Sequence, residues 1–202
     1  TQPPMVTACA GLDIVCHALE SFTARPFDQF EAKTAAQRVP YCGANPISDT
    51  WALAALRLVA EAFVPAVRTG DPEALATMAL AATVAGLGFG NAGVHIPHAN
   101  AYPIAGKVRD YQPPDYPTGP LVPHGMAVSL TAPAAFRALA GSDPARQQQA
   151  AHLLGGQDLP TVLRALMDAV GMPSGLREIG FAEADIPDLV EGTLAQQRLL
   201  AL

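Results

Sequence analysis

Several features that place a chain in a familiar class are scarce or missing here. The sequence has only 12 Lys and Arg against 18 Asp and Glu, a net charge of −6, and no basic cluster, which excludes a typical nucleic-acid surface. Its three cysteines, Cys9, Cys16 and Cys42, form no CxxC pair and are odd in number, so neither a zinc ribbon nor a disulfide framework is indicated. Free thiols suit a reducing compartment, and we expect a cytoplasmic protein.

Charge is also sparse: 15% of the 202 residues are charged and 50% are apolar. Residues 74–106 contain no Lys, Arg, Asp or Glu, a length that raises the question of a membrane helix. That stretch is interrupted by Asn91, His95, His98, Asn100 and several glycines, so we expect core helices and no membrane span. The opening TQPPMVTACAG lacks a basic region followed by an apolar run, so no signal peptide is indicated.

Alternating runs of Val, Ile and Thr are missing as well, whereas Ala and Leu dominate, and this favours an all-α helical bundle over residues 1–202. Asn45 and Asp71, each followed by Pro, predict the starts of two helices. Two irregular loops are expected at 24–44 and 107–123. The expected helices cover residues 7–23, 45–68, 71–89, 93–101, 123–140, 143–156, 158–172 and 182–194. Pro97 and Pro103 are expected to break the fourth of these.

What is present is a polar pair in an apolar helix, in the stretch GLDIVCHALESFTA. Asp13 and His17 are four residues apart, so they share one helix face, and a carboxylate oxygen and an imidazole nitrogen there can converge on one ion. A buried Asp–His hydrogen bond, or a pair at the helix edge, is the simpler interpretation of these two residues alone.

Two further segments strengthen the metal interpretation. GFGNAGVHIPHANAYPIAG carries His95 and His98, and LVPHG carries His124, each among small apolar residues where an unpartnered imidazole is costly. One Asp with three His would give a divalent metal four ligands, a set that suits Fe(II) or Zn(II) better than Ca or Mg. The fifth histidine, His152, lies in a polar segment and is interpreted as a surface residue.

Taken in order, these three motifs resemble the iron-containing (group III) alcohol dehydrogenases, over nearly the whole chain. The resemblance is to their C-terminal, all-helical metal-binding domain. The segments GANPISDTWALAALR, DYPTGPLVPHG and ADIPDLVEGTL are most similar to one branch, the hydroxyacid–oxoacid transhydrogenases. The chain begins with Thr and ends in the apolar RLLAL, so we expect a fragment truncated at both ends.

The resemblance implies that Asp13, His17, His98 and His124 bind the metal, Fe(2+) or Zn(2+). His98 is preferred to His95 because HANAYPIAG matches the family's pattern after its ligand.

Many members of the family carry a second His four residues after the ligand that corresponds to His98, where this chain has Tyr102. The phenol of Tyr102 could replace that proton relay, although the ordinary pKa of a phenol, about 10, is far from neutral. His95 could be a partner of a ligand, a substitute relay or a core residue. We favour a transhydrogenase cycle that needs little relay, since one half-reaction takes up the proton that the other releases.

In the family, NAD(P) lies between an N-terminal α/β domain and this domain. The resemblance therefore implies an oxidoreductase that oxidises the CH–OH group of a hydroxy acid or alcohol, such as 4-hydroxybutyrate, and reduces a 2-oxo acid, such as 2-oxoglutarate. No strand followed by a Gly-rich turn occurs here, so we expect the nucleotide-binding domain to be a separate partner and the isolated fragment to be inactive. A homodimer is a candidate assembly.

Carboxylate substrates favour Arg or Lys near the metal. The candidates lie in the two loops, where a solvated surface charge is the competing interpretation. They are Arg25, Arg38, Lys107 and Arg109.

Two functions of other classes compete. One is a non-catalytic helical metal-binding remnant. Within the family, a general iron-containing alcohol dehydrogenase is the alternative to the transhydrogenase. The other is a helical phosphohydrolase, which would need an adjacent His–Asp pair that this sequence does not contain.

Overall fold

The computed structural model describes residues 2–116 and 119–202. Over these residues the chain is helical, and its β-structure there is a single isolated bridge between Pro26 and Ala44. The expected all-α bundle is confirmed. Its helices are α1 (Pro4–Thr23), α2 (Pro46–Thr69), α3 (Pro72–Ala92), α4 (Ile96–Gly106), α5 (His124–Ala138), α6 (Pro144–Leu153), α7 (Leu159–Ala169), α8 (Ile186–Leu194) and α9 (Gln197–Leu200).

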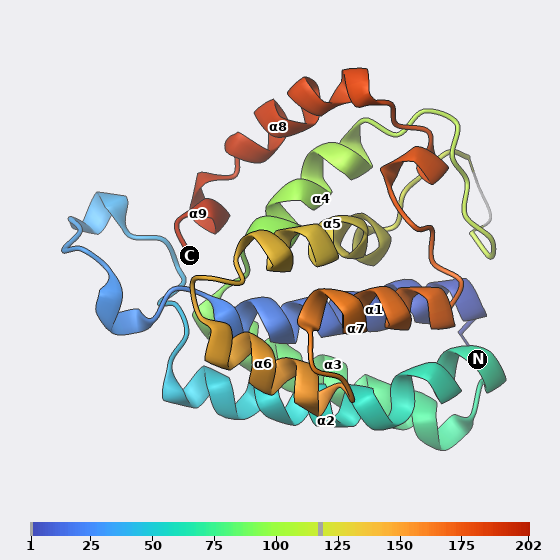
Figure 1. Ribbon diagram of the computed structural model, residues 1–202, viewed down its shortest axis with the longest axis horizontal. Helices are drawn as coiled ribbons and strands as arrows, with labels where there is room; N and C mark the ends of the chain where they lie inside the picture. The colour runs from blue at the N-terminus through green and yellow to red at the C-terminus, as the bar shows by residue number, and fades with distance from the viewer. Residues whose placement is uncertain (1, 117–118) are drawn as a thin grey trace.

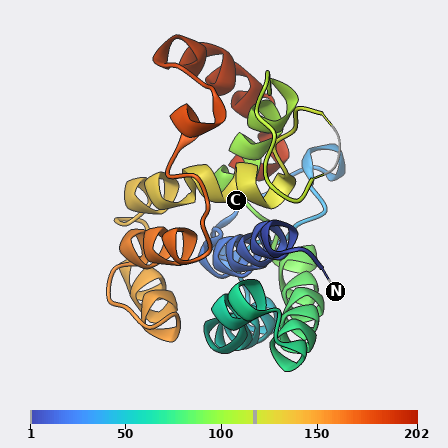
Figure 2. The same ribbon diagram turned by 90° about the vertical axis from the view of Figure 1, so that its right-hand side faces the viewer.

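Helix α1 runs through the middle of the molecule (Figures 1 and 2). Helices α2 and α3 pack on one side of it, α5 packs on the other, and α4 lies outside α5 with α8 outermost. Leu12, Val15 and Leu19 of α1 are fully buried, which follows from this central position. A polar side chain on a buried face of α1 therefore needs a partner there, because burying it without a hydrogen bond is costly.

Three helices, α1 to α3, are long and apolar enough to cross a membrane by length and composition alone. In the bundle α1 contacts both α2 and α3, and α2 contacts α3, but the most apolar windows of α2 and α3 are only 44% and 33% buried. The most apolar window of α1 is 72% buried within the protein.

The capping residues behave as the sequence predicts. The Asn45 side chain accepts hydrogen bonds from the backbone N–H groups of Ile47 and Ser48, and Asp71 accepts one from Ala74. The expectation for the fourth helix is wrong in its bounds, because α4 runs through both prolines. Pro97 lies in its first turn, where the N–H has no intrahelical partner to lose, and Pro103 is tolerated inside a helix fixed by tertiary packing.

Residues 24–44 contain two short 3₁₀ helices, η1 (Phe27–Gln29) and η2 (Ala35–Gln37), and extend away from the bundle at the left of Figure 1. The Pro26–Ala44 bridge closes the base of this loop. The loop therefore begins where α1 ends and returns to the bundle immediately before α2.

Gly125 allows α5 to approach α1 closely. A Cβ atom at this position would lie 2.0 Å from the backbone oxygen of Cys9, a distance that no side-chain rotation can relieve. The contact matters for the site, because Gly125 directly follows His124 at the start of α5.

We expect Gly125→Ala to destabilise the protein by about 3 kcal/mol, the upper part of the range for overpacking, because the clash is with backbone. Gly86→Ala is the matched control: it lies inside α3, and a Cβ there would meet nothing within 4 Å. The control should stabilise by roughly 0.5–1 kcal/mol through helix propensity. Thermal and urea unfolding of the protein that carries this chain measures both, and equal stability of the two variants would contradict the close approach.

Candidate metal centre

The site begins with three polar side chains along α1. Asp13, His17 and Glu20 are spaced i, i+4 and i+7, so the 3.6-residue repeat places them on one face of the helix. Glu20 is completely buried, whereas the side chain of Asp13 keeps 22% of its exposure. The face thus runs from a partly open end at Asp13 to a closed end at Glu20.

Side chains from α1, α4 and α5 meet at the open end. Asp13, His98 and His124 each offer one ligand atom, and these atoms lie within 4.8 Å of one another. Oδ1 of Asp13 is 3.4 Å from Nε2 of His98 and 3.8 Å from Nε2 of His124. Ligand atoms about 2.0–2.2 Å from one ion at tetrahedral angles lie roughly 3.3–3.6 Å apart, so the spacing is close to that of a coordination site.

The hydrogen bonding around this group also fits an ion. Oδ1 of Asp13 and Nε2 of His98 are buried, and neither has a hydrogen-bond partner among the described residues. Unsatisfied buried polar atoms are uncommon and each needs an explanation. Here the two atoms face one another, and a cation between them would satisfy both.

Glu20 fixes how His98 faces this point. Nδ1 of His98 donates to Oε1 of Glu20 over 2.6 Å, which leaves Nε2 directed at Asp13. A carboxylate behind a histidine is the usual support for a metal ligand, because it sets the tautomer and the ring orientation. Burial alone would lower the pKa of His98, but Glu20 and Asp13 outweigh it and raise the pKa to about 10. A proton and a divalent cation are alternative occupants of Nε2.

The second oxygen of Glu20 holds the start of α4. Oε2 accepts hydrogen bonds from the backbone N–H of His95 at 2.7 Å and of His98 at 3.4 Å. These groups belong to the N-terminal turn of α4, where backbone donors lack intrahelical partners and a negative charge is favoured. Burial would raise the pKa of Glu20, but His98 and His95 outweigh it and lower the pKa. Glu20 therefore stays ionised in the core.

His95 lies by Glu20 and the next turn of α1, outside the three-ligand group. The Thr23 hydroxyl donates to the carbonyl of Leu19, so the 3.0 Å bond between Thr23 and His95 must use Nε2–H of His95 as donor. Burial lowers the pKa of His95 and keeps it neutral. The structure thus makes His95 a partner of Glu20 and Thr23 rather than of Asp13.

His17 lies beside the group without joining it. Its ring stacks between Phe89, at 3.9 Å between centroids, and His98, at 4.5 Å. Its Nδ1 is 3.9 Å from Oδ2 of Asp13, the oxygen that the other two histidines do not approach. Burial lowers the pKa of His17 to about 4, so the ring is neutral as a ligand must be. Its assignment as a fourth ligand stays a prediction.

The outer side of the group is formed by His124 and Tyr102. The side chain of His124 is 50% exposed and Tyr102 is 43% exposed, and their ring centroids are 6.4 Å apart. The Tyr102 hydroxyl accepts a hydrogen bond from Nη2 of Arg198 at 2.8 Å. A small molecule can reach the ligand group from this side.

The four cations expected to bind substrate have other surroundings. Lys107 pairs with Asp188 of α8 at 3.4 Å, and Arg109 pairs with Asp185 directly before α8, so both fasten the loop after α4 to that helix. Arg25 lies over the ring of Phe30 in the 24–44 loop. Arg38 is exposed in the same loop, after η2. Their role as substrate contacts stays a prediction that these contacts do not favour.

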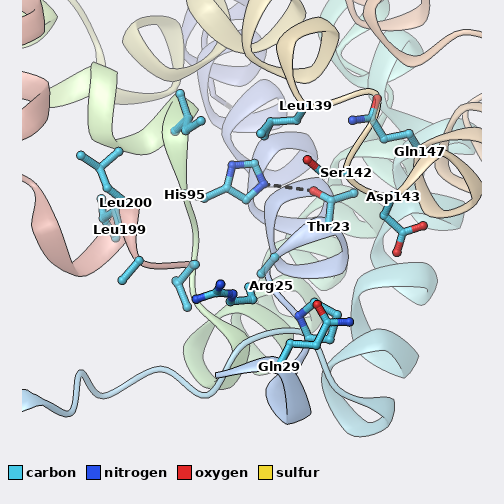
Figure 3. Close-up of a pocket in the computed structure, with 15 residues that line it drawn as sticks. Thr23, Arg25, Gln29, His95, Leu139, Ser142, Asp143, Gln147, Leu199 and Leu200 are labelled. Atoms are coloured by element: carbon cyan, nitrogen blue, oxygen red, sulfur yellow. Dashed lines mark hydrogen bonds between the residues drawn. The ribbon is translucent and has the colours of Figure 1, made fainter. Parts of the chain in front are cut away.

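A cavity of about 520 Å³ lies beside His95, not at the ligand group (Figure 3). Thr23, Arg25, Gln29 and Gln147 line it together with the end of the chain, residues 199–202. None of Asp13, His98 and His124 reaches its wall. We therefore assign the metal site to the ligand group, where Oδ1 of Asp13 and Nε2 of His98 face one another without partners, and not to this cavity.

Sequence reasoning missed three residues. Glu20 stands in the same quoted helix as Asp13, and its i+7 spacing was the available signal. Phe89, which stacks on His17, and Arg198, which binds Tyr102, gave no signal, since their proximity to the site arises only from the packing of α3 and α9.

Comparison with known proteins identifies relatives over nearly the whole chain. The model of the "Fe-containing alcohol dehydrogenase family, C-terminal" matches residues 7–201. The mitochondrial hydroxyacid-oxoacid transhydrogenases of Bos taurus and Homo sapiens are each 43% identical over 216 residues, covering 100% of this chain and 46% of their own length. The structure of sulfoacetaldehyde reductase from Bifidobacterium kashiwanohense in complex with NAD+ superposes with a TM-score of 0.76 at 26% identity, covering 98% of this chain and 46% of that one.

The chain therefore spans about half the length of the relatives it matches. The expected cytoplasmic location is contradicted, because these relatives are mitochondrial proteins. All three cysteines are free thiols, which indicate a reducing environment but do not distinguish one reducing compartment from another.

We expect Glu20→Gln to lower the affinity for Zn²⁺ or Fe²⁺ by about 10- to 100-fold, because the amide cannot hold His98 with a charge-assisted hydrogen bond. Metal competition with a chelator, followed by elemental analysis, measures the change. Ser21→Ala is the control, since Ser21 is equally buried and its hydroxyl has no partner in the described part of the chain. Unchanged affinity in Glu20→Gln would show that Glu20 does not support the ligand.

Proposed function

The chain belongs to the iron-containing alcohol dehydrogenase family, and from that premise we propose that it is the metal-binding half of an oxidoreductase acting on the hydroxyl group of a hydroxy acid or alcohol. The observation that carries this proposal is the meeting of Asp13, His98 and His124, with buried Glu20 directly behind His98. A carboxylate and imidazoles are ligands suited to Fe(II) or Zn(II).

Within the family we propose hydroxyacid–oxoacid transhydrogenase activity, with 4-hydroxybutyrate and 2-oxoglutarate as the substrate pair. The support is the 43% identity to enzymes of that name across all of this chain. Because those enzymes are about twice as long, the remaining half of the protein would supply an N-terminal domain for NAD(P).

When bound, the metal would supply Lewis acidity toward the substrate hydroxyl and the dinucleotide would supply the redox chemistry. The chain's own residues then have separate tasks. Asp13, His98 and His124 would hold the ion, and Glu20 fixes the ring of His98 with its Nε2 toward Asp13. Phe89 and His98 hold the ring of His17 between them, with its Nδ1 3.9 Å from Oδ2 of Asp13.

The two candidate relays have different surroundings. His95 is 2% exposed and its Nε2–H is bound to Thr23, away from the open side. Tyr102 is exposed, and its hydroxyl accepts a hydrogen bond from Arg198, which leaves its own O–H free to donate. The contacts of His95 support the proposal that the coupled reaction runs without a dedicated relay, the proton of one half-reaction being returned in the other, and Tyr102 is the residue on which that proposal is tested.

The direct test uses the full-length protein that contains this chain, loaded with Fe²⁺ or Zn²⁺. We expect oxidation of 4-hydroxybutyrate coupled to reduction of 2-oxoglutarate, and a loss of at least about a hundredfold in Asp13→Asn, since a Lewis acid contributes several kcal/mol. Asp168→Asn makes the same chemical change at an exposed position of α7 and should leave the rate unchanged. Full metal binding without turnover of any alcohol would instead identify a non-catalytic metal-binding domain.

Tyr102→Phe tests the relay. We expect it to retain the coupled activity within about tenfold, because the phenol is not the proton carrier. A loss of more than about a hundredfold in the rate of both the coupled reaction and net NAD reduction, the lower end of general acid–base contributions, would show that it is. His95→Gln is the companion variant, and a loss there alone would transfer the relay to His95.

A further inference from the structure

We propose that Arg198 is the residue that recognises the carboxylate of the substrate. The inference deepens the proposed function and rests on it. It concerns the exposed surface that begins at His124, crosses the ring of Tyr102 and ends at the guanidinium of Arg198. This surface is called the outer face.

The first observation is how Arg198 is fixed in place. Arg198 lies on α9. The residue that follows it, Leu199, is 1% exposed and packs with Val94 and Ala99 in a small apolar cluster. Phe89, the residue that stacks on His17, packs against the same cluster. Buried apolar contacts therefore hold α9 against the segment that carries His98, and the position of Arg198 follows from core packing.

The second observation is the direct contact with the outer face. Nη2 of Arg198 donates to the Tyr102 hydroxyl at 2.8 Å, and its Cζ is 5.9 Å from the centroid of that ring. The Tyr102 ring is in turn 6.4 Å from the ring of His124. A molecule held by its hydroxyl at the ligand group and extending over Tyr102 would reach the guanidinium.

The third observation is charge. Lys107 and Arg109 are both paired with aspartates, whereas the hydrogen-bond partner of Arg198 in the described part of the chain is a neutral phenol. A guanidinium has five N–H donors in a planar fork. Since the contact with Tyr102 uses one nitrogen, donors remain for a carboxylate, and the positive charge is not compensated by a neighbouring ion pair.

The two proposed substrates share the group that such a cation would bind. In 4-hydroxybutyrate the carbon bearing the hydroxyl is separated from a carboxylate by two methylenes. The same unit occurs in the 2-hydroxy acid formed from 2-oxoglutarate, which adds a second carboxylate on the hydroxyl-bearing carbon. By ordinary bond lengths the hydroxyl oxygen and the distant carboxyl carbon are about 5 Å apart when extended. The ring of His124 and Cζ of Arg198 lie 6.4 and 5.9 Å from the centroid of the Tyr102 ring, so that ring is the surface such an acid would cover between the two groups. One guanidinium can therefore serve both half-reactions in turn.

The competing account is that Arg198 only braces α9 against Tyr102. A brace would affect every substrate equally, whereas a carboxylate contact affects acids alone. The full-length, metal-loaded protein is assayed with 4-hydroxybutyrate and with its neutral analogue 4-hydroxybutyramide. Inhibition by butyrate, which keeps the carboxylate and lacks the hydroxyl, gives a second readout that needs no turnover of the analogue.

In Arg198→Gln we expect kcat/KM for 4-hydroxybutyrate to fall roughly 10- to 100-fold, the loss typical of a hydrogen bond to a charged group. The loss should appear chiefly in KM, with the inhibition constant of butyrate rising by a similar factor. Kinetics with the amide and the bound metal content should stay within about twofold. Arg198→Lys should recover part of the loss, and Arg57→Gln, which removes an exposed guanidinium of α2 outside the proposed site, should change none of these values.

The outcomes separate the two proposals. If the unaltered protein oxidises 4-hydroxybutyrate but Arg198→Gln weakens acid and amide equally, or leaves the inhibition constant of butyrate unchanged, the assignment of Arg198 is overturned and the proposed function stands. If the unaltered, metal-loaded protein oxidises no hydroxy acid, the proposed function fails, and the assignment of Arg198 fails with it.

Discussion

A carboxylate buried at the junction of two helices holds the site together. Glu20 is fully enclosed, and an isolated ionised carboxylate there would be strongly unfavourable. It is stabilised by the imidazole N–H of His98 and by two backbone N–H groups at the start of α4. Removing any of these donors leaves a fully buried charge with one partner fewer, a larger effect than the loss of a hydrogen bond between neutral groups. Glu20 therefore fixes both the orientation of the His98 ring and the packing of the start of α4 against α1.

The site has a buried end at this junction and an exposed end away from it. Its inner end, at Glu20 and His95, is buried, and both residues have hydrogen-bond partners in the protein. Its outer end, at His124 and Tyr102, is open. Asp13 lies between the two, with one oxygen toward His98 and His124 and the other toward His17. The side that orients the proposed ligands is buried in protein and the opposite side is exposed, as the proposed Lewis-acid site would require.

The helices around the site act as supports. Gly125 lets α5 lie directly on the backbone of α1, which brings His124 to Asp13. Two hydrogen bonds also fix α4 through the side chain of Asn100. Thr193 of α8 donates to Oδ1 of Asn100, and Nδ2 of Asn100 donates to Thr131 of α5. The helix that carries His98 is thus fixed from both sides by polar bridges as well as by packing. Such fixation lets a ligand keep its position without a bound ion to hold it.

The helical class and the starts of α2 and α3 follow from the sequence alone, because capping residues and apolar periodicity act locally. The sequence also indicated Asp13 and the three histidines, because polar residues among small apolar ones need a partner. It could not decide which side chains meet. His98 was separated from His95 only by resemblance, and the structure distinguishes them through Glu20, which receives the ring of one and the backbone of both. Arg198, 74 residues beyond His124, reaches the site because Leu199 packs into a cluster formed by distant segments. Contacts between residues far apart in sequence depend on how helices pack, and that was decided only by the tertiary structure.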